Sequence, residues 1–342
     1  MKKIWISCLA LILATVLLLG AVQALVRPKY RDTSREGALI GEYYSEPLYN
    51  HDVLFIGDCE VYESFTPPTL WSEYGITSYI RGSAQQLAWH SYYLLEDALR
   101  YETPKVVVFN VLALKYGEPQ DEAYNRMTLD GMRWSPSKIR AILASMTDEE
   151  EFSSYVLPLL RFHSRWDELK AEDVQELFGN EPISHNGYLM QTAVKGGRSE
   201  IAPTPLADYT LPAGSMQYLD KMRDLCAEKG IRLVLVKAPT NDWKYHWYDE
   251  WEAQIVAYAE ANQLPYYNFI PLCDEIGIDW STDTYDAGVH LNVYGAEKLT
   301  SYFGAILAKE LELEDRRGDT ALSALWQEKI NAYYAERNAS AE

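Results

Sequence analysis

The chain has 342 residues, of which 48% are hydrophobic and 24% are charged, which is enough for a substantial core in one large domain or two smaller ones. Its formal net charge of -19 argues against nucleic-acid binding, because an acidic surface repels phosphate backbones. Anionic lipid headgroups would repel it as well, so any attachment to a membrane has to come from an inserted segment.

The first segment of the chain has the composition of a membrane-inserting helix. Lys2 and Lys3 precede an uncharged apolar stretch, residues 4–26, which at about 1.5 Å per residue can cross a hydrocarbon layer of roughly 30 Å. The stretch is apolar on every face and begins the chain, which argues against a core helix. We predict an uncleaved signal-anchor over residues 1–28 that contacts the bilayer through residues 4–26. Cleavage after Val22-Gln23-Ala24, which loosely resembles a small-residue site, stays open.

Basic residues lie on both sides of this segment. Lys2 and Lys3 precede it, and Arg27, Lys29, Arg31 and Arg35 follow it, so the positive-inside rule does not select an orientation. A basic start, an apolar stretch and then a long domain is the order of an export signal. We therefore predict a single-pass protein of the cell membrane whose main domain, residues 29–315, is extracytoplasmic.

Short apolar runs and amphipathic stretches alternate along this domain. Strands are predicted at 53–56, 77–80, 105–109, 232–236 and 265–269, and helices at about 84–101 and 293–311. Strands separated by helices imply a parallel sheet covered on both faces. The prediction is a flavodoxin-like three-layer α/β fold.

The pattern breaks between residues 115 and 212. This stretch has no clear strand and is rich in aromatic and charged residues, so we predict a largely helical insertion after the third strand. Ligands of open α/β sheets bind outside the carboxyl ends of strands, where such an insertion would roof the site. Within it, the cluster 161–166 combines guanidinium and indole groups suited to a polyol or an anionic polymer. One more helix is predicted over residues 316–342.

Residues suited to acyl transfer stand at the predicted strand ends. They are Gly57-Asp58-Cys59, Gly82, Asn110, and Asp286 with His290. Cys59 would be a nucleophile at a strand-to-helix turn, with His290 as its base and Asp286 fixing the tautomer. The backbone N–H groups of Cys59 and Gly82 and the amide of Asn110 would donate to an oxyanion.

In these blocks the chain resembles the SGNH/GDSL hydrolase superfamily. The four blocks are 55–59, 81–83, 107–110 and 285–292, and the resemblance covers about 52–311 without the insertion. It implies an acyl-ester hydrolase or O-acyltransferase with Gly82, Asn110 and Asp58 at the oxyanion and substrate side. With the anchor, the chain looks most like members that alanylate teichoic acids or acetylate exopolysaccharides. The implied partners are a cell-wall or exopolysaccharide glycopolymer and a multipass acyltransferase.

The chain departs from the family pattern at two positions. Cys59 stands where the family has serine, and its flanking residues Asp58 and Glu60 oppose the pKa lowering that a helix N-terminus gives a thiol. Asp286 and His290 are separated by three residues instead of two, so Asp283 is a rival partner for His290. The alternative hypothesis is therefore a catalytically inactive SGNH-fold subunit that binds glycan or a membrane acyltransferase.

The remaining patterns predict no cofactor. Histidines are scattered without metal-ligand spacing, and neither a phosphate loop nor a dinucleotide fingerprint follows the first strand. Cys8 lies in the membrane segment, and an odd number of cysteines remains, so at least one of Cys59, Cys226 and Cys273 is a free thiol. Cys226 continues an apolar helix face and is predicted to lie in the core.

Overall fold

The computed structural model describes residues 2–27, 37–175, 177, 182–197, 202–242 and 245–339. Five parallel strands form one sheet in the order β2-β1-β3-β4-β5. The strands are β1 (Val53–Gly57), β2 (Ser78–Gly82), β3 (Val106–Asn110), β4 (Arg232–Lys237) and β5 (Tyr266–Asn268). The α/β prediction is confirmed. The basic residues Lys29, Arg31 and Arg35 lie outside the described residues.

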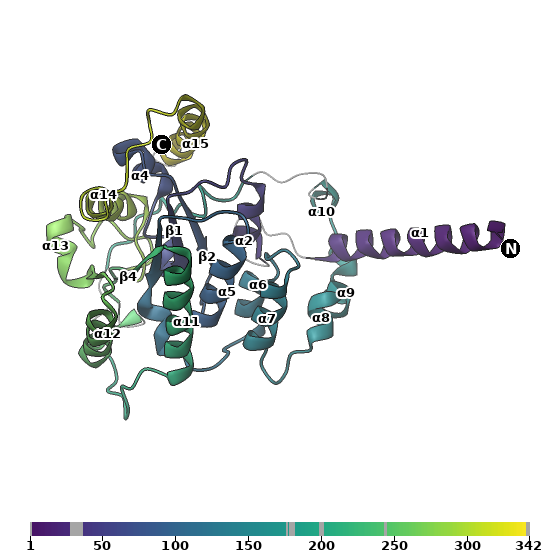
Figure 1. Cartoon of the computed structure of the whole chain (residues 1–342), viewed down its shortest axis with the longest axis horizontal. Coiled ribbons are helices and arrows are strands. Elements are labelled where there is room, and N and C mark those ends of the chain that lie inside the picture. Colours follow the sequence, from purple (N-terminus) through teal and green to yellow (C-terminus); the bar gives the residue numbers. More distant parts are fainter. Residues whose placement is uncertain are drawn as a thin grey trace.

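Helices cover both faces of the sheet (Figure 1). One face carries α4 (Pro67–Tyr74), α14 (Val293–Lys309) and, beyond them, α15 (Thr320–Ala339). The other carries α5 (Ala88–Ala98), α11 (Ala213–Lys229) and α12 (Asp249–Asn262).

The alternating direction of side chains along the strands explains why helices cover both faces of the sheet. In β1, Phe55 packs in the same cluster as Phe303 of α14, whereas its neighbour Leu54 packs in the cluster that contains Leu95 of α5. Successive side chains of a strand point to opposite faces, so a strand that is apolar throughout requires cover on both sides.

Short helices occupy much of the stretch after β3. They are η3 (Val111–Lys115), α6 (Glu122–Leu129), α7 (Pro136–Ser145), α8 (Phe152–Val156), α9 (Pro158–Phe162), η4 (His163–Asp167) and α10 (Ala171–Gln175). Of these, α7 packs against α5, beside the sheet. The returning chain, in contrast, runs past the carboxyl ends of the strands: Gln191 accepts from the backbone of Val293, and Lys195 donates to that of Thr284. The return segment therefore borders the predicted site.

The N-terminal helix α1 (Lys2–Val26) projects away from the domain (Figure 1). It has 25 residues, and an 18-residue stretch of it has a mean hydropathy of 2.6, so the helix is long and apolar enough to cross a membrane. Its last turn is the part that meets the domain, where Val26 is buried and α1 contacts α9 and η4. The remaining short helices are α2 (Ala38–Glu42), η2 (Tyr43–Ser45), α3 (Cys59–Tyr62), η6 (Ile270–Leu272) and α13 (Cys273–Ile276).

Candidate active site

Cys59 lies at a sharp turn where β1 ends and α3 begins. The Asp58 side chain caps α3 by accepting from the backbone N–H of Glu60 at 3.2 Å. Gly57 permits the turn, because a Cβ there would lie 2.5 Å from Cγ2 of Val61. The strand end thus presents the Cys59 thiol at the carboxyl edge of the sheet, almost fully buried.

Gly82 ends the neighbouring strand level with Gly57. A Cβ at Gly82 would lie 3.0 Å from the Gly57 carbonyl oxygen and 3.2 Å from Cδ1 of Tyr62. The missing side chain lets α3 approach the end of β2. Gly82 is therefore placed beside the cysteine turn, as the predicted site requires.

The loop before α14 brings His290 and Asp286 together. Asp286 accepts from the backbone N–H of His290 at 2.9 Å through Oδ1, and its Oδ2 lies 2.7 Å from His290 Nδ1. Two successive residues with positive φ, Ala287 at 67° and Gly288 at 96°, fold the loop back on itself. The hydroxyl of Thr284 accepts from the N–H of Gly288 at 2.9 Å and holds this turn. The left-handed pair thus absorbs the extra residue in the Asp-x-x-x-His spacing.

Asp283, the other candidate partner of His290, instead bonds to a neighbouring turn and to α14. Its Oδ2 accepts from the Asp279 N–H at 2.8 Å and from Lys298 Nζ at 2.6 Å. The side chain is 2% exposed and ties the preceding turn to α14. Asp286 is thus the aspartate that bonds to the ring of His290.

The His290 ring also interacts with the thiol of Cys59. Its Nε2 is buried and has no hydrogen bond of ordinary geometry within the described part of the chain. The ring interacts with Cys59 by charge and by hydrogen bonding, and both effects lower the pKa of the thiol. Burial is the larger effect and raises that pKa, and the charges of Asp58 and Glu63 add to it. The net effect of these contributions is a thiol pKa above its ordinary value.

A second carboxyl group, Glu63, stands beside His290. Its Oε2 lies 3.4 Å from His290 Nδ1 and accepts from the hydroxyl of Tyr285 at 2.9 Å. Burial raises the pKa of Glu63 to about 7. Burial lowers the pKa of His290, but the opposing charges of Cys59 and Glu63 and the bond to Asp286 together raise it well above 6.5. No sequence block pointed to Glu63, which lies on the turn after α3.

These charges set a pH dependence for thiol reactivity. His290 can take the thiol proton only when it is neutral, so alkylation of Cys59 should rise with pH in a range above the ordinary histidine value of 6.5. Glu63→Gln removes a negative charge that raises the pKa of both His290 and Cys59. We expect the rise to move to lower pH in this variant, as measured by iodoacetamide alkylation rates across pH. An unmoved profile would show that Glu63 carries no charge at the site, and an alkaline shift would contradict the predicted effect of its charge.

Tyr245 completes the contacts of the thiol and was missed by sequence reasoning, because it belongs to no motif. Its hydroxyl lies 3.3 Å from Sγ of Cys59, and its ring meets that of His290 edge-on with centroids 5.2 Å apart. The ammonium of Lys115 lies 5.5 Å from the centre of the Tyr245 ring. Burial, with the nearby Cys59, raises the pKa of the Tyr245 hydroxyl, so it stays protonated and can donate to a thiolate.

Tyr245→Phe tests this donor. A hydrogen bond to a charged group contributes about 1.5–3 kcal/mol, so loss of the hydroxyl should slow alkylation of Cys59 about 10- to 100-fold at a fixed pH. Tyr302→Phe is the matched control, because its hydroxyl bonds to Glu275 at 2.8 Å on another face. Unchanged or faster alkylation of the Tyr245 variant would mean that the ring only covers the sulfur.

Asn110, which we predicted to donate to an oxyanion, has its amide group engaged by neighbouring side chains. Its Nδ2 donates to Asp58 Oδ1 at 3.2 Å and to Glu60 Oε2 at 2.9 Å, and its Oδ1 accepts from the backbone of Ala238. Lys237 Nζ lies 2.7 Å from Glu60 Oε1 in the same buried cluster. Both amide hydrogens are held by carboxylates, which attract them by charge. Asn110 and Asp58 therefore brace the base of the cysteine turn.

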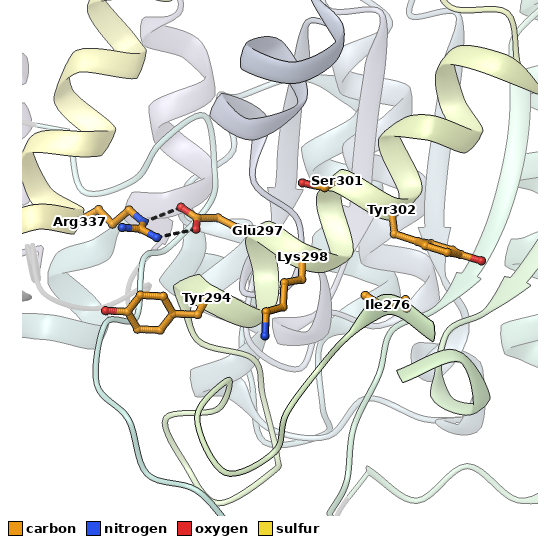
Figure 2. A pocket seen from close by; sticks show the side chains of 7 residues that line it. All are labelled: Ile276, Tyr294, Glu297, Lys298, Ser301, Tyr302 and Arg337. Atoms are coloured by element: carbon orange, nitrogen blue, oxygen red, sulfur yellow. Dashed lines mark hydrogen bonds and ion pairs between the residues drawn. The ribbon is translucent and has the colours of Figure 1, made fainter. Parts of the chain in front are cut away.

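A separate pocket of about 530 Å³ lies along α14 and the end of α15 (Figure 2). Its ionic side chains pair with each other or with neighbours: Arg337 Nε lies 2.7 Å from Glu297, and Lys298 bonds to Asp283. It does not include Cys59 or His290. Among the residues that the structure describes, no three His, Cys, Asp or Glu side chains converge to bind a metal ion.

Comparisons with known proteins show similarity in structure alone. No protein-family model matches the sequence, and no curated protein is detectably similar to it. A candidate acylhydrolase of Bacteroides fragilis aligns at 13% identity and TM-score 0.37, over 79% of this chain and 95% of its own. A candidate lipolytic protein of the G-D-S-L family from Desulfitobacterium hafniense aligns at 12% identity and TM-score 0.37, over 75% of this chain and 100% of its own. A GDSL-like lipase of Bacteroides thetaiotaomicron aligns at 13% identity and TM-score 0.34, over 75% of this chain and 88% of its own. At this similarity their chemistry does not transfer to this chain.

Proposed function

We propose that the chain is a membrane-tethered acyl-ester hydrolase or O-acyltransferase that uses Cys59 as its nucleophile. The observation that carries the proposal is the bond between Asp286 and Nδ1 of His290, at 2.7 Å, together with the interaction of the His290 ring with the thiol of Cys59. An acid, a base and a nucleophile in this order are the components of nucleophilic acyl transfer.

The reaction follows from these contacts. With Nδ1–H donated to Asp286, neutral His290 has its lone pair on Nε2 and takes the proton of Cys59. The sulfur attacks the acyl carbonyl, the ester C–O bond breaks, and the leaving oxygen takes that proton from His290. Water or an acceptor hydroxyl then attacks the thioester, and the thiolate leaves and regains a proton. The backbone N–H groups at Cys59 and Gly82 and the hydroxyl of Tyr245 are the candidate oxyanion donors.

The proposed substrate is a glycopolymer of the cell envelope, such as a cell-wall polymer or exopolysaccharide. Three features support it: the resemblance of the four sequence blocks, the apolar helix α1, and the export-type order of the N-terminus. On this proposal the domain is extracytoplasmic, and a multipass acyltransferase is a fitting donor partner.

Trapping the acyl enzyme tests the reaction. The full chain in detergent is incubated with a chromogenic acetyl ester or an acetyl thioester, quenched in acid and mapped by mass spectrometry. We expect an acetyl group on Cys59 that disappears in His290→Ala, with Cys273 as an internal control thiol. Absence of both acylation and hydrolysis, also with an O-acetylated cell-wall polymer, would refute the enzyme.

One set of observations favours a second function, a catalytically inactive subunit that binds glycan or a membrane acyltransferase. Burial raises the pKa of Cys59, Tyr245 contacts its sulfur, and Asn110 has no free amide hydrogen. This reading requires that Cys59 react no faster than Cys273 while the chain still binds glycan or co-purifies with a membrane protein.

A further inference from the structure

Apolar side chains are exposed on the short helices next to α1. Leu160 of α9 is 54% exposed and Trp166 of η4 is 64% exposed. Val156, Leu157 and Val174 are also exposed. We name these five residues the collar: Val156, Leu157, Leu160, Trp166 and Val174. An isolated exposed apolar residue needs no explanation, but a group on adjoining elements marks an interaction surface.

The collar lies where α1 leaves the domain (Figure 1). The helix contacts α9 and η4, which carry Leu160 and Trp166. Arg165 Nη1 donates to the carbonyl oxygen of Val26 at 2.8 Å and so caps the C-terminus of α1. Its Nη2 lies 3.1 Å from Asp173 of α10, which ties α10 to the same junction. The 161–166 cluster therefore joins the apolar helix to the domain.

This position determines what the collar would meet. If α1 crosses a bilayer, its last turn is at the membrane surface, and so are the elements that contact that turn. Tryptophan is enriched at that depth because its ring is apolar and its N–H is polar.

The segment that holds the collar is close to neutral. Residues 152–174 contain three basic residues (Arg161, Arg165 and Lys170) and four acidic ones (Asp167, Glu168, Glu172 and Asp173), a net charge of -1. The whole chain carries -19. Anionic headgroups would therefore repel this segment only weakly.

We propose that the collar inserts its side chains into the bilayer interface around the end of α1 and so fixes the orientation of the domain on the membrane. This inference rests on the membrane tether of the proposed function and is independent of the acyl chemistry. A rigid orientation holds the Cys59 site at a constant height above the lipid.

Single fluorescent probes test the collar. The full chain carries Cys8→Ala, Cys59→Ala and Cys273→Ala, which removes the accessible thiols and the proposed nucleophile and keeps the buried Cys226. An environment-sensitive dye is attached to Leu160→Cys, to Leu13→Cys inside α1, or to Val256→Cys. Val256 is an exposed apolar residue of α12 and serves as the matched control. Each protein is reconstituted into phosphatidylethanolamine–phosphatidylglycerol vesicles that contain nitroxide-labelled lipid.

We expect lipid quenching at positions 13 and 160 and several-fold less at 256. Quenching at 13 without quenching at 160 would overturn the collar and leave the tether intact. No quenching at 13 would overturn the tether and the collar with it. Equal quenching at 160 and 256 would indicate unspecific adsorption and overturn the collar. Quenching of position 160 in these vesicles but not in native membranes to which the same lipid is added would show that a protein covers the collar. That result would also overturn its insertion into the bilayer.

Discussion

Cys59→Ala should lower acyl-ester turnover by at least about 1000-fold, because residual binding and oxyanion donors cannot replace a nucleophile. The loss should be in kcat, with the substrate affinity little changed, since the alanine retains the shape of the turn. Initial rates against acyl ester concentration measure both quantities. Retained turnover would move the chemistry away from Cys59.

Two variants separate the role of this sulfur from that of thiols in general. Cys273→Ala should leave turnover unchanged, because Cys273 lies on α13 and its sulfur bonds to the Phe269 carbonyl oxygen at 3.6 Å. Cys59→Ser should retain more activity than the alanine variant, because His290 can also deprotonate an alcohol. A serine variant as inactive as alanine would indicate that a thiolate is required.

Most of the fold could be predicted from the sequence. The strands were recognisable because a buried parallel strand is a short run of apolar residues ended by a polar or small one, as in β1 and β3. Helix α4 was missed. It starts at Pro67-Pro68 behind the capping residue Thr66, and these prolines are typical of a turn when the tertiary cover is unknown.

The site could be predicted only in part. Cys59, Asp286 and His290 stand in strand-end blocks, and the structure brings them together. Which aspartate bonds to His290 depends on the left-handed turn at Ala287, a conformation that alanine seldom adopts and no spacing rule predicts. Tyr245 reaches the thiol from a loop distant in sequence, so only the folded chain reveals it.

The cluster beneath the cysteine turn was also invisible in the sequence. Lys237 and Glu60 are 0% and 1% exposed and lie 2.7 Å apart, yet they are 177 positions apart in the chain. Such a buried ion pair contributes about as much to the free energy of unfolding as apolar residues of similar size would. Removing one partner, however, leaves the other charge buried without a counter-ion. Asn110 and Asp58 share this cluster, so its integrity determines the position of Cys59.

Lys237→Met should therefore destabilise the protein by about 3–5 kcal/mol, because Glu60 and Asp58 lose their buried cation. Urea unfolding of the full chain in detergent, followed by tryptophan fluorescence, measures the change. Adding Glu60→Gln should restore most of the lost stability. The glutamine carbonyl can still accept from Asn110, and this side chain no longer carries an unpaired buried charge. Lys229→Met is the control, because its pair with Glu228 is exposed and should contribute at most about 1 kcal/mol.

The pH dependence of this loss has a definite sign. Burial and the charge of Glu60 raise the pKa of Asp58 from 3.8 to about 7 in the folded protein, whereas Lys237 lowers it. Folding therefore favours the protonated form of Asp58, and the associated stability is present below pH 3.8 and is lost as pH rises through about 7. Without Lys237 the folded pKa rises further, so the deficit of Lys237→Met should be smaller in acid and larger above pH 7. A deficit independent of pH, or one that Glu60→Gln fails to reduce, would show that the lysine acts by packing its stem and not by its charge.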